Sequence, residues 1–565
     1  MAEQWDREVD VLVAGSGAAG MTAAVTAADL GLTVLVAEST ERWGGTTMRS
    51  GGGLWLPDNP VMKRHGIADS RAEALTYLQA AIGDPDLPSS TARREAFVDA
   101  VTPLVELLER LGVRWIPAVK YPDYYPDRPG GKVGRSLEVA PFDARRLGDW
   151  LATSRIGDAI PVPLRNGDVH LLSRAWSTPS GFVAGAAFVF RTLGGLLTGR
   201  KLVGMGGALM LSLGDIARRQ GVELLLSSPV TELVRDGDGR VTGAVLDSPG
   251  GPVRVRARRG VILGAGGFAN NTEWRQRYQG IPGYSSAAEG DLGTAIELGH
   301  RAGGALAYLD DAWWGASVPI PGKQPLFVLN ERSDPFSIVV DRTGRRYLNE
   351  SESYIDFGHD LLARDRIAPA NPSWLVMDVR HRRRYLFSGL LVGGKRMFAE
   401  GIAVKARTLD GLAEAMGVDR ETFRATVERF NGFARTGVDE DHGRGRTAYD
   451  RYYSDPRVKP NPNLGPIEKG PFTAVQLVPG DLGTKGGLVT DEHGRVLTDT
   501  GDPVPGLYAA GNTTASVMGR TYPGPGSTIG PAAVFGYLAA RHAAATGAST
   551  ALAPEAATTE EGTLA

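Results

Sequence analysis

The residue types and spacing near the start of the chain are those of a dinucleotide-binding turn: Gly15, Ser16, Gly17, Ala18, Ala19 and Gly20. Residues 9–14 before it form an apolar run of strand length, and an alanine-rich helical pattern follows from residue 21 to about residue 29. The first glycine allows a tight turn, the second lets backbone approach a pyrophosphate, and the third lets helix and strand pack closely. The helix then points free N–H groups at the phosphates. These features together predict a βαβ unit that binds a dinucleotide.

A carboxylate follows where such a unit meets the ribose. Residues 33–37 have the pattern of the second strand, and Glu38 ends it. At that position a carboxylate can accept hydrogen bonds from both ribose hydroxyls, and it disfavours a 2′-phosphate. Two glycine-rich stretches, 43–47 and 50–57, come directly afterwards, and their backbone can lie against a flat or charged ligand. No histidine lies in these stretches, so a histidyl-linked flavin has no attachment point there.

Composition and charge restrict the class of protein. At 565 residues the chain exceeds what one hydrophobic core usually supports, so two or more domains are expected. A formal net charge of −2 gives no reason to propose nucleic acid as a partner. The absence of cysteine excludes disulfides, cysteine-ligated zinc and iron–sulfur clusters held by this chain, and no metal site is expected. The polar first residues run straight into a strand, which predicts a cytoplasmic location, and the Ala-, Thr- and Glu-rich tail is expected to be disordered.

Several later segments must position the ligand and its reacting groups. Strand patterns occur at 222–226, 230–234, 241–245 and 259–268. Residues 308–483 contain more Pro, Arg and aromatic residues, which indicates a change of domain. Residues 506–512 indicate a return to the nucleotide domain, and the glycine-rich segment 519–531 begins the last helix. Three loops of the chain carry tyrosines. Tyr124 lies in a stiff, proline-bounded turn, Tyr347 follows a turn, and Tyr522 lies beside glycines and prolines.

These motifs resemble the flavoprotein superfamily of the fumarate reductases and succinate dehydrogenases. The shared features are the N-terminal turn, Gly44-Gly45-Thr46, and residues 263–267, 507–512 and 526–531. Within that superfamily, four segments look like those of the 3-ketosteroid Δ1-dehydrogenases: residues 122–125, 344–351, 481–488 and 522–526. The resemblance covers most of the chain, with residues 140–215 the poorest match.

The resemblance implies an α/β fold in which a Rossmann-like FAD-binding domain is split in sequence by an inserted α+β catalytic domain. The implied FAD-binding parts are 1–307 and 484–546, the catalytic domain is 308–483, and 547–565 is the tail. FAD would be bound non-covalently, with the steroid A-ring against the flavin. By similarity, the residues at the FAD are Gly15, Ser16, Gly17, Ala18, Ala19, Gly20, Glu38, Gly44, Gly45, Thr46, Ser50, Gly51, Gly52, Val230, Ala265, Gly266, Gly511, Asn512, Gly526, Thr528 and Ile529.

The implied reaction is a 1,2-desaturation beside the C3 ketone of a 3-ketosteroid. It requires a base for the C2 proton, donors to the ketone oxygen, and a hydride acceptor facing C1, which the flavin supplies. By similarity, Tyr347 is the base, Tyr124 helps to carry the proton away, and Tyr522 with the N–H of Gly526 holds the ketone oxygen. A free tyrosine has a pKa of about 10, so a phenolate at neutral pH needs help from its surroundings.

Three alternatives stay open. A fumarate reductase would need clustered Arg and His for a dicarboxylate, but the closing segment offers only Arg520. A 3-ketosteroid Δ4-(5α)-dehydrogenase would also use tyrosines but would react at neighbouring carbons. A flavin-binding module without enzymatic activity is the alternative from a different class. Because the chain cannot hold an internal cluster relay, a diffusible quinone is the expected electron acceptor.

Residues 176–213 contain three uncharged runs, at 177–190, 192–199 and 202–213. None reaches the 20 or so apolar residues that a membrane-spanning helix needs. One interpretation is a buried helical hairpin within the fold. The other is peripheral contact with the inner face of the cell membrane, with Trp176, Arg191, Arg200 and Lys201 at the headgroups.

Overall fold

The first strand of the chain lies inside an eight-stranded sheet of a computed structural model that describes residues 4–159 and 162–548. β1 (Arg7–Ala14) pairs in parallel with β2 (Val34–Ala37) and β11 (Gly251–Leu263). Val11 and Val13 join one hydrophobic core and Leu12 joins another, because successive side chains point to opposite faces of a strand. The other strands are β8 (Glu223–Leu225), β9 (Val230–Arg235), β10 (Val241–Ser248), β20 (Arg495–Leu497) and β21 (Pro503–Ala509).

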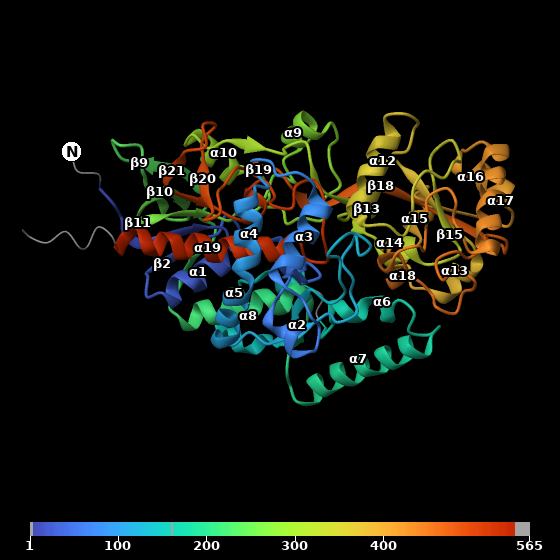
Figure 1. The fold of residues 1–565 in the computed structure, drawn as a ribbon, viewed down its shortest axis with the longest axis horizontal. Helices are drawn as coiled ribbons and strands as arrows, with labels where there is room; N and C mark the ends of the chain where they lie inside the picture. Colours follow the sequence, from blue (N-terminus) through green and yellow to red (C-terminus); the bar gives the residue numbers. More distant parts are fainter. Residues whose placement is uncertain (1–3, 160–161, 549–565) are drawn as a thin grey trace, which may run out of the picture.

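Helices from both ends of the chain cover this sheet. α1 (Ala18–Asp29) packs against α19 (Ile529–Ala548) and α8 (Met205–Arg219), and Figure 1 shows α1 and α19 together although they are more than 500 residues apart. The parallel order β21-β11-β1-β2-β8 needs such helical cover. The predicted α/β class is therefore confirmed, while the predicted tail at 547–565 begins inside α19, which ends at Ala548, and its remaining residues, 549–565, lie outside the described part of the chain.

A six-stranded sheet is built entirely from the chain between residues 312 and 484. Its long strand β18 (Phe472–Thr484) pairs with β13, β16 and β17. Just outside it, β12 (Leu306–Ala307) pairs with β19 (Gly487–Leu488). The other strands are β13 (Ala312–Val318), β14 (Leu326–Phe327), β15 (Ser337–Val340), β16 (Ser373–Met377) and β17 (Ala403–Ala406).

Helices surround this second sheet at one end of the molecule (Figure 1). α12 (Tyr354–Asp365) packs against β13, and α17 (Arg420–Thr436) begins at the capping Asp419 and ends at Gly437 in the left-handed conformation. Residues 341–350, whose sequence predicts a turn followed by a strand, form a turn and irregular backbone after β15 ends at Val340. The other helices are α11 (Asn330–Ser333), α13 (Val379–Arg384), α14 (Ser388–Gly393), α15 (Arg396–Ala399), α16 (Leu409–Met416) and α18 (Ala448–Tyr452).

The segment between β2 and β8 forms a third region. It contains a three-stranded sheet in the order β3-β5-β4 and the paired strands β6 and β7. Its strands are β3 (Leu54–Trp55), β4 (Trp115–Pro117), β5 (Ser136–Val139), β6 (Phe142–Asp143) and β7 (Leu202–Val203). Its helices are α2 (Pro60–Arg64), α3 (Arg71–Ile82), α4 (Thr91–Asp99), α5 (Val101–Leu111), α6 (Val169–Leu172) and α7 (Pro179–Leu197); α9 (Thr272–Trp274) and α10 (Thr294–Arg301) follow later.

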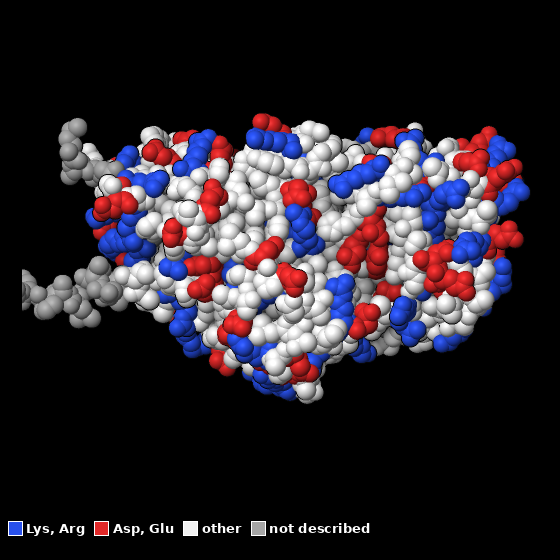
Figure 2. Space-filling view, turned by 45° about the horizontal axis from the view of Figure 1, so that its top comes forward, with Lys and Arg blue, Asp and Glu red and all other residues white. Residues whose placement is uncertain are grey.

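The two halves of the uncharged segment 176–213 have different surroundings. α7 lies at the edge of the molecule with only Gly181 and Gly195 buried (Figure 1), so the predicted buried hairpin does not form. α8, by contrast, is buried along most of its length, from Gly206 to Ala217. Elsewhere on the surface, basic and acidic side chains are interspersed on the face seen in Figure 2.

Candidate active site

The turn between β1 and α1 leaves room for a ligand against bare backbone. Gly15 has φ +96°, and a Cβ there would lie 2.6 Å from the Cα of Ala265. A Cβ at Gly20 would overlap the carbonyl oxygen of Gly15. Gly17 caps α1 without a side-chain hydrogen bond, so the first turn of the helix presents backbone N–H groups. This geometry suits a pyrophosphate.

Glu38 lies directly after β2 and is buried beside this turn. Its Oε2 accepts hydrogen bonds from the N–H and the hydroxyl of Ser16, at 3.2 and 2.6 Å. Its Oε1 accepts from the N–H and hydroxyl of Thr40, at 3.0 and 2.9 Å. The N–H of Gly44 donates to the Ser16 oxygen at 2.9 Å. The structure therefore brings together three residues that the sequence assigned to the ribose and its surroundings.

The next glycines close over the same turn. Gly45 has φ +53°, and a Cβ there would lie 3.2 Å from the Cα of Gly17. Thr46 donates to Asp291 at 3.3 Å, and a Cβ on Gly266 would overlap that carboxylate. Ala265 and Gly266 follow β11, the strand next to β1. Val230 begins β9, two residues after Ser228, whose N–H donates to the Glu38 carbonyl at 2.9 Å.

The far wall comes from the end of the chain. Gly511, Asn512 and Thr528 line a cavity together with Trp313. The indole N–H of Trp313 donates to the Asn512 side-chain oxygen at 3.0 Å. Ile529 begins α19. On the opposite side, Ser50 accepts from the N–H of Gly52 at 3.1 Å, and Gly51 lies against Asn166.

These residues form a long cradle of backbone with two buried acids, Glu38 and Asp291, and the cradle fits FAD. The strongest indication is the N-terminus of α1, which has no side-chain cap and lies beside the buried Glu38, while close packing at Gly15, Gly20 and Gly266 keeps this backbone bare. Of the residues predicted at the cofactor, those named above lie at this cradle and would hold it.

Three tyrosine rings meet where this cradle faces the six-stranded sheet. The ring of Tyr522 lies 5.2 Å from that of Tyr124 and 4.8 Å from that of Tyr354, and Tyr124 lies 5.4 Å from Tyr354. Tyr354 is the first residue of α12, and the N–H of Tyr124 donates to the Pro523 carbonyl at 2.9 Å. Burial raises the pKa of all three hydroxyls above the ordinary value, by a large margin for Tyr124 and Tyr354.

Gly526 completes this group. It has φ +99°, and a Cβ there would overlap the carbonyl of Gly53. Burial raises the pKa of the Tyr522 hydroxyl, while hydrogen bonds with Thr528, Tyr354 and the backbone of Gly526 lower it, so these groups converge on one oxygen. The Thr528 hydroxyl donates to it at 3.1 Å. A substrate oxygen replacing part of this network would meet a hydroxyl and a backbone N–H.

Tyr347 does not belong to the group. Its ring packs against the core that contains Val339 and Leu375, and its hydroxyl lies 2.8 Å from the Ser373 oxygen. Ser373 donates its own proton to the Ala370 carbonyl at 2.6 Å, so Tyr347 is the donor in that contact. Tyr354, which sequence reasoning did not single out, is the tyrosine that lies beside Tyr124 and Tyr522.

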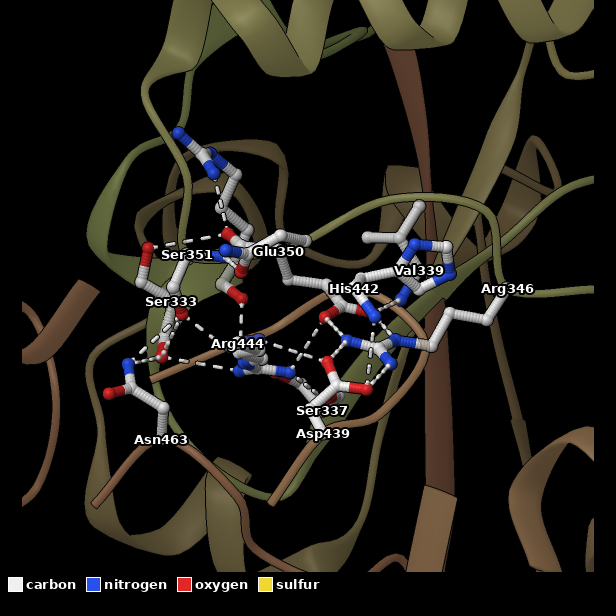
Figure 3. Close-up of polar contacts among 12 residues, drawn as sticks. Ser333, Ser337, Val339, Arg346, Glu350, Ser351, Asp439, His442, Arg444 and Asn463 are labelled. Atoms are coloured by element: carbon white, nitrogen blue, oxygen red, sulfur yellow. Dashed lines mark hydrogen bonds and ion pairs between the residues drawn. The ribbon is translucent and has the colours of Figure 1, made fainter. Parts of the chain in front are cut away.

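Buried ion pairs fix the loop that leads into Tyr354 (Figure 3). Arg444 donates to the Ser337 carbonyl at 2.7 Å, to Glu350 at 3.1 Å and to the Ser351 hydroxyl at 3.2 Å. Arg346 donates to both oxygens of Glu350, each at 2.7 Å. Because these partners lie in β15 or between β15 and α12, the network holds the segment that leads into α12.

Further tyrosines extend the aromatic wall. Tyr449 lies 4.5 Å from the Tyr124 ring, and Tyr121 stacks 4.5 Å from Tyr452. The hydroxyl of Tyr121 is hydrogen-bonded to that of Tyr453. The sequence signal that could have found them is the dense run Tyr449, Tyr452 and Tyr453.

Comparison with known proteins adds to this geometry. Residues 10–529 match the family described as FAD binding domain. The 3-oxosteroid 1-dehydrogenase of Mycolicibacterium smegmatis is 44% identical over 566 residues, covering 96% of this chain and 98% of the relative. The 4-oxocyclohex-2-ene-1-carboxylate 5-dehydrogenase of Sinomonas cyclohexanicum is 38% identical, covering 95% and 93%. The crystal structure of 3-ketosteroid Δ1-dehydrogenase from Sterolibacterium denitrificans in complex with 1,4-androstadiene-3,17-dione superimposes with a TM-score of 0.89 at 36% identity, covering 96% and 100%.

Proposed function

Because this chain belongs to the FAD-dependent 3-oxosteroid 1-dehydrogenases, we propose that it introduces the C1–C2 double bond into the A-ring of 3-ketosteroids. The observation that carries the proposal is the meeting of Tyr354, Tyr522 and Gly526 beside the cofactor cradle. We interpret the eight-stranded sheet as an FAD domain split in sequence, and the six-stranded sheet as the inserted catalytic domain.

The chain's own residues act at two places on the A-ring: the oxygen of the C3 ketone and the neighbouring carbon C2. Tyr522 and the N–H of Gly526 donate to the C3 oxygen, where negative charge develops when C2 loses its proton. Preorganised donors of this kind are each worth about 3 kcal/mol in the transition state. Tyr354, on the facing helix, takes the C2 proton as a phenolate. FAD, when bound, supplies the hydride acceptor for C1.

We assign the base to Tyr354 in place of Tyr347. A base must reach the proton that it removes, and the Tyr347 hydroxyl is directed to Ser373 within a packed core. Tyr354 instead shares the Tyr522 hydroxyl's hydrogen-bond network. Tyr124, whose ring contacts both, is suited to pass the proton away from the site.

A product assay tests this function. With 4-androstene-3,17-dione and an artificial electron acceptor, the expected product has lost one hydrogen from C1 and one from C2. Desaturation of a 5α-reduced steroid at C4–C5 would favour the Δ4-(5α)-dehydrogenase, and turnover of fumarate would favour a fumarate reductase. Turnover of a 4-oxocyclohexene carboxylate without steroid turnover would favour the chemistry named for the Sinomonas relative. Bound flavin without any turnover would indicate a binding module.

The electron acceptor that we propose is a quinone, and α7 supports a membrane location for its reduction. Phe182, Phe190 and Leu197 are 68%, 74% and 88% exposed, and α7 has the length and apolar composition of a membrane-crossing helix. Only 11% of its most apolar stretch is buried in the fold. We propose that α7 lies in the membrane interface as a peripheral anchor, where sterols and quinones both partition.

Only part of the segment 176–213 is exposed and available for the proposed membrane contact. The run from Met205 onward is buried in α8 and cannot reach lipid. Arg191 donates to the Pro163 carbonyl at 2.8 Å and pairs with Asp168, so it belongs to the fold and not to the headgroups. Arg200 and Lys201 are exposed at the end of α7, and Trp176 is exposed before its start. The proposed location is therefore cytoplasmic, with α7 against the inner face of the cell membrane.

Co-sedimentation with anionic liposomes tests this contact. The wild-type protein is expected to sediment, and a variant with Phe182, Phe190 and Leu197 all changed to Ser is expected to stay in solution. A matched control changes three apolar residues exposed elsewhere, Leu87, Ile367 and Val438, to Ser. Equal sedimentation of all three folded proteins would show that α7 is not the anchor.

A further inference from the structure

Lys485 is a buried cation that the proposed reaction does not use. It follows β18 directly, at the point where the chain leaves the six-stranded sheet, and its side chain has no solvent exposure. Its ammonium donates to the Thr521 carbonyl at 2.9 Å and lies 4.4 Å above the Trp313 ring. A buried ammonium is costly unless it is paired, so its partners indicate why it is kept.

The partner charge is Asp311, which comes directly before β13 at the other crossing between the two sheets. Its Oδ2 lies 3.8 Å from the Lys485 ammonium. Its Oδ1 accepts from the Ala312 N–H and from His359, both at 2.9 Å. Arg520 also approaches Oδ2 at 3.8 Å. The carboxylate thus joins a buried lysine to a histidine that is 36% exposed.

Both ends of this chain of contacts reach a tyrosine of the site. His359 belongs to α12, the helix that begins at Tyr354. Thr521 immediately precedes Tyr522, and the Trp313 ring packs edge-on against Tyr522 at 5.2 Å. The same indole donates to Asn512 in the cofactor cradle. Lys485 therefore holds Tyr522 at two points, its backbone and its ring, while Asp311 ties the same unit to α12.

We propose that Lys485 and Asp311 are positioning residues that set Tyr522, the ketone donor, at its working distance from Tyr354, the base. The inference rests on the proposed function and extends it, because Tyr354 begins α12 and Tyr522 lies in the distant segment before α19, so the two need a fixed connection. A loosely held donor costs binding and rate, since catalysis depends on preorganised geometry.

The charge state of the pair supports this role. Burial lowers the pKa of Lys485 to about 8, while Asp311 acts to raise it, so the lysine is an ammonium at neutral pH. Burial would raise the pKa of Asp311, but Lys485 and His359 hold it below its usual range. The pair is therefore ionised at neutral pH.

A double-mutant cycle with Tyr522→Phe tests the proposal on the FAD-loaded enzyme. Lys485→Met keeps the length of the side chain and removes the charge and the hydrogen bond to Thr521. We expect it to weaken 4-androstene-3,17-dione binding and to slow anaerobic flavin bleaching by about tenfold each, the worth of one well-placed hydrogen bond. In the Tyr522→Phe background the same change is expected to have less than about a twofold effect, because the donor it positions is gone. Lys405→Met, at an exposed lysine, controls for the substitution itself.

Equal factors in the two backgrounds would show that Lys485 only supports the fold, and the proposal would be overturned. If Lys485→Met does not retain FAD, His359→Phe breaks the chain at its exposed end, and we expect its smaller loss to disappear in the Tyr522→Phe background in the same way. Additive losses for His359→Phe would also overturn the proposal. Wild-type protein that binds the steroid without desaturating it would contradict the proposed function, while the binding cycle would still measure the coupling.

Discussion

Removing the hydroxyl of Tyr354 or of Tyr347, each in a separate variant, distinguishes the proposed reactive tyrosine from the structural one. Tyr354→Phe removes a group that faces Tyr522, and the rings around it, Tyr124 and Phe327 among them, can keep their packing. Loss of a general base costs about 10²- to 10⁴-fold in rate, which corresponds to about 3–5 kcal/mol of activation free energy. Steroid affinity is expected to fall much less, because the base makes its main contribution in the transition state.

Tyr347→Phe is the matched control within the same segment. It loses one buried hydrogen bond, to Ser373, so the free energy of unfolding is expected to fall by about 1 kcal/mol. The rate of flavin bleaching by substrate should stay within about twofold of wild type, because no group of the site contacts this hydroxyl. Stopped-flow bleaching and chemical denaturation measure the two quantities. A Tyr347→Phe variant that loses activity while Tyr354→Phe keeps it would refute the assignment.

Three further outcomes are expected. Burial raises the pKa of Tyr354 above its ordinary value, so its phenolate stays a minor species whose fraction grows with pH, and the bleaching rate should rise from about pH 6 to about pH 8, the range in which Lys485 keeps its charge; a rate that falls over this range would contradict a tyrosine base. Gly526→Ala should lower the rate by about 10²-fold, because φ +99° and the Gly53 carbonyl leave no room for a Cβ and the donor must move; near wild-type turnover would remove Gly526 from the ketone site. The purified protein should be yellow and should release FAD when denatured, and a supernatant that contains only FMN, or no flavin, would argue against the Glu38 assignment.

The cofactor cradle could be predicted because its signal is local. Gly15 to Glu38 form one continuous βαβ unit, so spacing along the chain fixes spacing in space. The stretch that contains Gly45 follows Glu38 in the sequence, whereas Gly266 is predicted by the family resemblance and lies shortly after β11, the strand next to β1. Because only glycine fits where the backbone packs this closely, the residue type itself indicates such positions in the sequence.

The base could not be placed in the same way. Tyr347 lies in the irregular segment between β15 and α12, and Tyr354 is the first residue of α12, so no periodicity tells which of the two side chains turns toward the site. The orientation of this segment depends on groups that are distant in sequence, above all Arg444, which donates hydrogen bonds to Ser337, Glu350 and Ser351. The surroundings of the uncharged runs at 176–213 could not be predicted either, since composition does not distinguish the exposed α7 from the buried α8.

The most direct test of the account is anaerobic mixing of the FAD-loaded protein with 4-androstene-3,17-dione. We predict that the flavin absorbance bleaches in a single turnover and that the steroid recovered is the 1,4-diene, with a slower reaction when deuterium replaces the hydrogens at C1 and C2. A flavin that stays oxidised in the presence of bound steroid, or a product unsaturated elsewhere in the ring, would contradict the assignment of this site to C1–C2 desaturation.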